Sequence, residues 1–389
     1  MSRRAMSYRR RGLAAAMCVL LAGGLASAGG LIQPNGLSNK DVRPLREVPT
    51  IQVPQVDLAA VSREDDARAL AGEPVRFAIP NDVRIIPEND GTWERLDNDR
   101  WMWRLRIHAE GAQSINLGFG RYHMPEGGMM FVYATDGTSS LRPFTPMDNE
   151  AHGELWTPVV VSDDIIVEVV LYEKQLDNLA LELTSINYGY RGFGDLVERS
   201  GSCNNDVVCP EGDDWQDEIS TVGAISTGGS IFCTGFMVNN TANDLTPYFM
   251  TANHCGINTG NAASLVVYWN FETSTCGGTP DGVLTDFQTG SFFRASYATS
   301  DFTLVELDDD PDPDWEIGFA GWDRRDMSFS DGAVGIHHPQ GDEKRISFEG
   351  DPVVPDTYLG EAPPGNSTHL WVSSWDDGTT EPGSSGSPL

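Results

Sequence analysis

The chain has 389 residues, enough for two or three domains, and 40% of them are hydrophobic, which suffices for ordinary packed cores. A formal net charge of -31 argues against a nucleic-acid partner, because tracking phosphates requires clustered Lys and Arg. From residue 200 onward there are 30 Asp and Glu against 5 Lys and Arg. This imbalance favours solubility outside the cell, in salty water for example, with weak steering of cationic substrates as the second interpretation.

Residues 1–28 have the pattern of an export signal. Five arginines precede an apolar run from Leu13 to Leu25, and the run ends in Ala26-Ser27-Ala28. Cleavage is expected after Ala28. A lipid-modified Cys18 is disfavoured by the bulky Met17, whereas a twin-arginine route at Ser2-Arg3-Arg4 stays open. Because no later stretch approaches the length of a membrane span, the mature protein is expected to be soluble, secreted through the periplasm and free of membrane.

The next regions differ in pattern. Residues 29–75 are rich in Pro, Asp and Glu with little periodicity, which predicts a leader or linker. Residues 76–199 predict a β-rich unit, with strands at 101–107, 128–133 and 165–171. Charge and cysteine content change abruptly near residue 200, which indicates a domain boundary there. Residues 200–389 again alternate short strands, such as 263–269, with turns, and an antiparallel barrel or sandwich is expected.

The cysteines predict disulfides. Apart from Cys18 they all follow the boundary, and they lie in an exported chain: Cys203, Cys209, Cys233, Cys255 and Cys276. Zinc is the weaker alternative because no CxxC pair is present. An odd number leaves one partner missing. No metal and no cofactor are expected.

Gly383-Ser384-Ser385-Gly386-Ser387-Pro388 is the sharpest candidate for chemistry. A serine nucleophile needs its hydroxyl on a tight turn with backbone N–H groups directed at the developing oxyanion. Ser385 is therefore the candidate nucleophile, with the amides of Gly383 and Ser385 as the oxyanion hole. A Gly/Ser cluster is by itself more often a flexible loop, so the assignment needs partners.

Two further segments supply those partners. An apolar run from Tyr248 ends in Asn253-His254-Cys255, where a disulfide would fix the turn that carries His254. Asp301 opens the run 302–307, where a buried carboxylate can hold an imidazole in the correct tautomer. Each alone has an ordinary structural interpretation. The adjacent His337 and His338 are interpreted as a structural turn rather than a metal pair, and the acidic run 308–314 as a solvated loop rather than a calcium site.

The order His254, Asp301, Ser385 is that of trypsin-like double barrels. Beyond the order, residues 200–389 resemble the bacterial lysyl endopeptidases, which are secreted trypsin-fold proteases with a signal peptide and a propeptide. The resemblance is carried by long runs, listed by residue number: 201–204, 207–212, 238–244, 266–270, 320–326, 343–347 and 380–388. The run 188–193 resembles such propeptides more loosely.

The resemblance implies a fold, a reaction and partners. The fold would be an all-β trypsin-like double antiparallel β-barrel, incomplete in its second barrel. The implied triad is His254, Asp301 and Ser385, hydrolysing peptide bonds of proteins after Lys through an acyl-enzyme. Residues 29–199 would be a propeptide that aids folding and inhibits the enzyme, which is expected to be a monomer. Disulfides would join Cys209 to Cys276 and Cys233 to Cys255, with Cys203 bound to a cysteine beyond the chain end.

Departures from the family pattern limit which of the family's properties the resemblance implies for this chain. The strands that build the specificity pocket follow the nucleophile, whereas this chain ends at Leu389, so the chain as it stands is expected to be inactive. Tyr358 occupies the stretch where the family has a tryptophan, and Ser384 replaces the Asp that in trypsin pairs with the new N-terminus. Arg or broader specificity and an inactive protease-like binding module therefore remain as alternatives.

Overall fold

A computed structural model describes residues 33–97, 99–192, 201, 203–323, 332–356 and 368–389. The expected export signal, the boundary at 199–200 and Tyr358 lie outside these residues. Strands dominate the described chain, and its longest helix has 13 residues, so the all-β class is confirmed. No helix in the described ranges is both long and apolar enough to cross a membrane.

The segment expected to be a leader or linker contains regular structure. It holds α1 (Asn35–Ser38), β1 (Thr50–Gln52), α2 (Leu58–Leu70) and β2 (Val75–Arg76). The Asp57 carboxylate caps α2 by accepting from the amides of Ala59 and Ala60. β1 pairs in parallel with β5 of the following unit. The segment predicted as a leader or linker thus contains a helix and short strands that its sequence did not indicate, because neither a three-residue strand nor a weakly amphipathic helix gives a clear periodic signal.

Residues 78–189 form two facing sheets. The first has the order β1-β5-β9-β7, with β4 also on β5, and the second has the order β3-β10-β6-β8. The strands expected around 101–107, 128–133 and 165–171 are present as β5, β7 and β9. The bounds are β3 (Ala78–Ile85), β4 (Thr92–Arg95), β5 (Arg100–His108), β6 (Ser114–His123), β7 (Met129–Ala134), β8 (Leu155–Trp156), β9 (Asp164–Tyr172) and β10 (Ala180–Gly189).

The second half is built on one large antiparallel sheet with the order β16-β15-β12-β13-β14-β18-β17. Its two edge strands are consecutive in the chain with only Gly290 between them, so the sheet bends round on itself as in a barrel. The run expected as a strand at 263–269 is a 3₁₀ turn followed by a shorter strand. The bounds are β12 (Val222–Thr227), β13 (Ile231–Met237), β14 (Tyr248–Ala252), β15 (Val266–Tyr268), β16 (Phe287–Thr289), β17 (Ser291–Tyr297) and β18 (Phe302–Leu307).

Smaller sheets complete the second half and fit the expected trypsin-like arrangement. One has the order β11-β20-β19, and the other pairs β21 with β22. Their bounds, with the one α-helix of this half among the described residues, are β11 (Asn205–Asp206), α3 (Gln216–Ile219), β19 (Ala333–His337), β20 (Arg345–Glu349), β21 (Val354–Asp356) and β22 (His369–Trp371).

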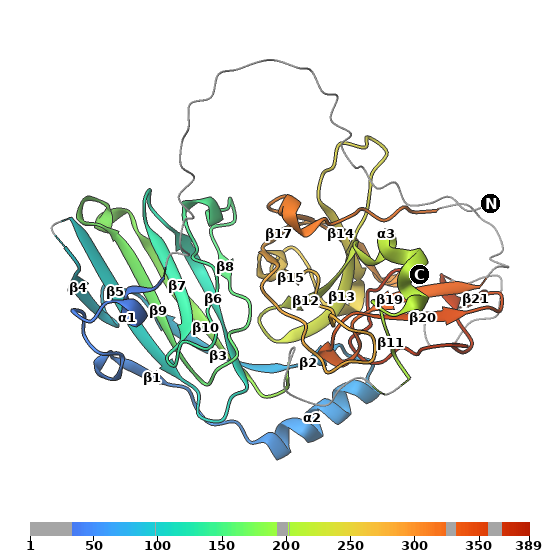
Figure 1. The fold of residues 1–389 in the computed structure, drawn as a ribbon, viewed down its shortest axis with the longest axis horizontal. Helices are drawn as coiled ribbons and strands as arrows, with labels where there is room; N and C mark the ends of the chain where they lie inside the picture. Colours follow the sequence, from blue (N-terminus) through green and yellow to red (C-terminus); the bar gives the residue numbers. More distant parts are fainter. Residues whose placement is uncertain (1–32, 98, 193–200, 202, 324–331, 357–367) are drawn as a thin grey trace.

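The two halves share one hydrophobic core. Phe232, Tyr268 and Phe287 of the second half are buried in the same cluster as the interior of the sandwich. The Tyr268 hydroxyl accepts from the amide of Val159 (3.2 Å) across this contact. Figure 1 shows the blue-to-green sandwich beside the yellow-to-red half, with β2 lying between them.

Candidate active site

His254 lies at the end of β14, in a 3₁₀ turn over Asn253–Cys255 that is closed by Gly256 in the left-handed region (φ 84°). β14 is hydrogen-bonded between β13 and β18, so its end is fixed on both sides. The Cys233–Cys255 disulfide crosslinks the turn to β13. A strand end held in this way gives the imidazole a defined position.

Asp301 makes two contacts with His254. One carboxylate oxygen accepts from the His254 backbone N–H (2.8 Å), and the other lies 2.6 Å from His254 Nδ1. Asp301 itself has φ 51°, a left-handed conformation that Asp tolerates better than most residues. Burial acts to raise the pKa of Asp301, but the hydrogen bonds from His254 outweigh it and the pKa is lowered. Asp301 is therefore an anion that orients the ring.

The turn around Ser385 packs against the same strands. Thr234 of β13 donates its hydroxyl to the Gly383 carbonyl oxygen (2.9 Å) and its N–H to the Ser385 carbonyl oxygen (2.8 Å). That oxygen also lies 3.8 Å from Cys255 Sγ, next in sequence to His254. The structure thus brings all three predicted catalytic segments to one end of β13 and β14.

Two amides of this turn have no acceptor among the residues that the structure describes. Gly383 and Gly386 have φ of 101° and 89°, which a side chain would strain. The Ser384 N–H is used by the Glu381 carbonyl oxygen (3.0 Å). In contrast, the N–H groups of Gly383 and Ser385 donate to no acceptor among the described residues. They are the two amides that the sequence assigned to an oxyanion hole.

A buried contact behind the turn was not anticipated. The Ser384 hydroxyl lies 2.8 Å from His337 Nδ1, and His337 Nε2 lies 3.2 Å from Ser347 Oγ. Because the Ser347 hydroxyl donates to the Thr379 carbonyl oxygen, His337 must donate from Nε2 and accept at Nδ1. Burial lowers the pKa of His337 to about 4, so the ring is neutral. The sequence around His337 does not indicate this contact, because Ser384 lies 47 positions further along the chain.

His337 and His338 end β19 and begin the next turn, in agreement with their interpretation as a structural pair. His338 is stacked on Phe271, with ring centroids 5.8 Å apart, and its Nδ1 lies 3.0 Å from the Asp342 carbonyl oxygen. Within the described ranges no group of three or more His, Cys, Asp or Glu side chains is arranged to hold a metal ion.

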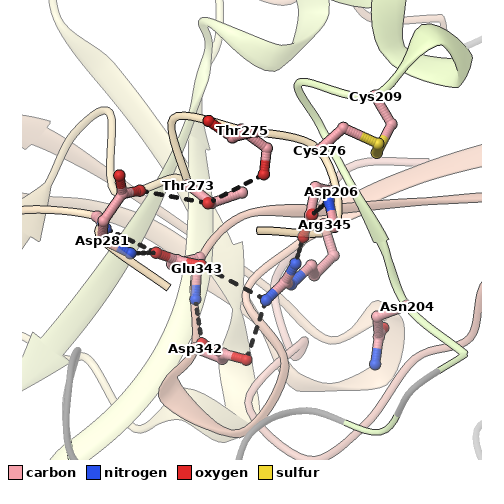
Figure 2. Close-up of polar contacts among 12 residues, drawn as sticks. Asn204, Asp206, Cys209, Thr273, Thr275, Cys276, Asp281, Asp342, Glu343 and Arg345 are labelled. Carbon is pink, nitrogen blue, oxygen red and sulfur yellow. Dashed lines mark hydrogen bonds and ion pairs between the residues drawn. A yellow bond between two sulfur atoms is a disulfide. The ribbon is translucent and has the colours of Figure 1, made fainter. Parts of the chain in front are cut away.

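A second buried network fastens the start of the second half to β20. The Arg345 guanidinium pairs with Asp206, with Asp342 (3.2 Å) and with Glu343 (3.6 Å), as Figure 2 shows. Glu343 also accepts from the amides of Asp281 (2.9 Å) and Gly282 (2.7 Å). Several partners are needed because a buried charge without them is costly. Residues 343–347 are part of the family resemblance, and their sequence alone does not indicate this role.

The disulfides are those implied by the family resemblance. Cys209 is bonded to Cys276, close to the Arg345 network, and Cys233 is bonded to Cys255 beside His254. Cys203 is exposed and has no disulfide partner within the described part of the chain. Its expected bond to a cysteine beyond Leu389 stays a prediction.

Comparison with known proteins agrees with this geometry. The family described as "Lysyl endopeptidase, C-terminal domain" matches residues 197–389. A lysyl endopeptidase of Pseudomonas aeruginosa is 28% identical over 332 residues, which cover 78% of this chain and 69% of the relative. The chain is a bacterial lysyl endopeptidase-like protein. The match to the Pseudomonas aeruginosa relative extends into the sandwich, because 78% of the chain is more than the second half contains.

Two solved protease structures give a weaker likeness. The active form of a protease from M. tuberculosis has a TM-score of 0.27 and 15% identity, covering 50% of this chain and 77% of its own. The protease Anisep from Arthrobacter nicotinovorans also has a TM-score of 0.27, with 17% identity, and covers 48% of this chain and 79% of its own. These scores are too low to establish a shared fold. The support for a protease comes instead from the family match and the Pseudomonas aeruginosa relative.

Proposed function

We propose that this protein is a secreted serine endopeptidase with His254, Asp301 and Ser385 as its catalytic triad. The observation that carries the proposal is the pair of contacts that Asp301 makes with His254, through the backbone N–H and through Nδ1. The disulfide at Cys255 fixes this histidine beside a turn in which two amides have no acceptor among the described residues. A structural histidine does not require a carboxylate on Nδ1 and a serine turn packed against the same strand end.

The reaction proceeds in two halves. His254 removes the proton from Ser385 Oγ as that oxygen attacks the carbonyl carbon of the scissile bond, and the imidazolium is stabilised by Asp301. The amides of Gly383 and Ser385 donate to the oxyanion of the tetrahedral intermediate. His254 then gives the proton to the leaving amine, leaving an acyl-enzyme. Water, deprotonated by His254, attacks the ester and releases the acid, and the proton returns to Ser385.

The test replaces the attacking oxygen. We predict that Ser385→Ala in the full-length gene product lowers kcat by about a million-fold, the usual loss for a triad nucleophile, with an unchanged circular dichroism spectrum. Ser220→Ala is the matched control, since the Ser220 hydroxyl donates to the Asp217 carbonyl oxygen on the surface. Turnover by the Ser385→Ala variant near that of the control would remove Ser385 from the mechanism. A protein that cleaves nothing and does not react with a serine-directed phosphonate would be a binding module instead.

For specificity, we propose cleavage after Lys. The support is the Pseudomonas aeruginosa relative, which is named a lysyl endopeptidase, and the strong negative charge of residues 200–389. Peptide amides that end in Lys, Arg and Leu separate the possibilities. A kcat/KM for Lys at least tenfold above that for Arg is expected, whereas equal values would support Arg or broader specificity.

Residues 29–199 are proposed to be a propeptide, and export is proposed to precede maturation. Two disulfides in the second half suit an oxidising compartment, and the change in charge near residue 200 coincides with the start of the family match. N-terminal sequencing of the secreted protein should find a start within a few residues of Ser200. A mature product that begins near Gly29 would show that the sandwich is retained.

A further inference from the structure

The two-residue strand β2 crosses from the N-terminal half into the sheet of the protease half. Arg76 is paired with Ile231 and Val75 with Phe232 of β13, in antiparallel register. The next residue extends the pairing, because the Phe77 N–H donates to the Ser230 carbonyl oxygen (2.9 Å). Residues 75–77 thus form a short added strand on a sheet to which they do not otherwise belong (Figure 1).

The edge that β2 covers is the open end of β13. One side of β13 is paired with β12 from Ile231 to Phe236. On the other side β14 pairs only with Gly235–Met237. Without β2, Ser230–Phe232 would have no strand partner on that side among the described residues, and such an edge is a template for an extended peptide.

This edge adjoins the serine turn. A Cβ added to Gly383 would lie 2.9 Å from the Phe232 ring, so that ring packs directly on the turn. Two residues further along β13, Thr234 donates to the carbonyl oxygens of both Gly383 and Ser385. An extended polypeptide that approaches Ser385 from this side of the turn would therefore lie beside Ser230–Phe232.

Residues outside the protease half hold β2 in place. The Arg76 guanidinium is bound by Asp65 (3.0 Å) and Glu64 (3.1 Å), both on α2. The Tyr190 hydroxyl, just after the last strand of the sandwich, lies 2.5 Å from Asp65 and 2.7 Å from the Arg76 carbonyl oxygen. Phe77 is buried in the core that includes Phe232. The strand is thus fastened by side chains on both sides of it.

We propose that the Ser230–Phe232 edge binds the extended backbone of polypeptide substrates, and that Val75–Phe77 occupies it in the precursor. The proposal rests on the proposed protease function and adds to it the location and partner of a binding edge. In this proposal β2 is the inhibitory element of the N-terminal half. It excludes polypeptides long enough to need this edge, while the turn that carries Ser385 and its amides is already formed.

The experiment compares two substrates on the unprocessed full-length protein, with intactness checked by mass spectrometry. One is a quenched ten-residue peptide with a single central Lys, and the other is a lysine ester with no further residues. Val75→Pro removes a backbone N–H from β2, and Asp65→Asn weakens the hold on Arg76 and Tyr190 without touching the backbone. Arg84→Ala is the control, since it breaks an exposed pair with Glu182 on the neighbouring strands.

Both β2 variants should raise kcat/KM for the peptide by about tenfold, with ester hydrolysis changed less than twofold. For Val75→Pro this corresponds to the loss of a backbone hydrogen bond, and for Asp65→Asn to the weakening of charge-assisted side-chain contacts to Arg76 and Tyr190. The Arg84→Ala variant should match the wild type on both substrates. Equal gains on peptide and ester, or no gain on either from both variants, would overturn the proposal.

Hydrogen exchange separates this outcome from a failure of the proposed function. The amide of Phe232, which is paired with Val75, should exchange faster in both β2 variants than in the wild type, whether or not any form is catalytically active. If no form cleaves either substrate while this amide responds as stated, β2 covers the edge but the protease assignment fails. If its exchange is unchanged, the binding edge itself is wrong.

Discussion

The two halves of the molecule are both all-β, yet they are stabilised differently. The sandwich has no cysteine among its residues and buries a continuous core between two sheets. Its ion pairs form smaller groups, such as Glu94 with Arg104 (2.5 Å) and Arg43 (4.0 Å). The second half has two disulfides and a buried cluster around Arg345, and it carries 30 of the 57 acidic side chains but 5 of the 26 basic ones. The acidic half thus depends on crosslinks where the sandwich depends on apolar area.

Reducing the disulfides should give the largest difference in stability between the two halves. The disulfides close loops of 22 and 67 residues, for which chain entropy predicts about 3 and about 4 kcal/mol. We expect dithiothreitol to lower the denaturant midpoint of the second half while the exchange-protected core of the sandwich is unaffected. Hydrogen exchange resolved by region checks this, because a single melting curve would merge the two halves. Equal loss of protection in both would show that they unfold as one unit.

Breaking the ionic cluster should act on the same half. Arg345→Met leaves Asp206 and Glu343 buried without their cation, and a loss of about 3 to 5 kcal/mol is expected. The matched substitution in the exposed pair of Arg84 with Glu182 should cost less than about 1 kcal/mol. Urea unfolding followed by tryptophan fluorescence measures both. A small effect of Arg345→Met would mean that solvent reaches the cluster.

Acid should also affect the second half selectively through His337. Its pKa falls from 6.5 in the unfolded chain to about 4 when buried, so between these values the unfolded chain binds a proton that the folded one does not. Stability is therefore full above pH 6.5 and lost as pH falls toward 4, by about 3 kcal/mol in total. His337→Asn should flatten this part of the curve of unfolding free energy against pH. A curve unchanged by that substitution would assign the acid sensitivity elsewhere, for example to His338, whose pKa burial also lowers.

The smallest expected effect concerns α2, the helix that precedes the sandwich. Asp57→Ala removes the cap of α2 and should cost about 1 kcal/mol. Exchange of the α2 amides should rise while the disulfide-bonded half is unchanged. Asp57→Asn is the control, because the amide oxygen can still accept from Ala59 and Ala60. If the alanine and asparagine variants behave alike, the cap contributes little.

The sequence predicted what depends on local pattern. Runs such as Trp101–Ile107 and Ile165–Leu171 are apolar and β-branched enough to announce strands, and His254, Asp301 and Ser385 each lie in a recognisable strand-and-turn context. The pairing of the cysteines came from family resemblance, since spacing alone permits several pairings. What lay outside prediction depends on distant contacts: β2 is a strand only because β13 offers an open edge, and the role of His337 appears only once Ser384 lies beside it.

The hydrogen bond between His337 and Ser384 has a kinetic consequence. It lies wholly within residues 333–389, and together with Thr234 it holds the serine turn while the N-terminal half is still attached. If the covering strand is what restrains the proposed enzyme, its removal leaves no slow rearrangement to wait for. Activity should then appear at the rate of the cleavage event itself, without a lag.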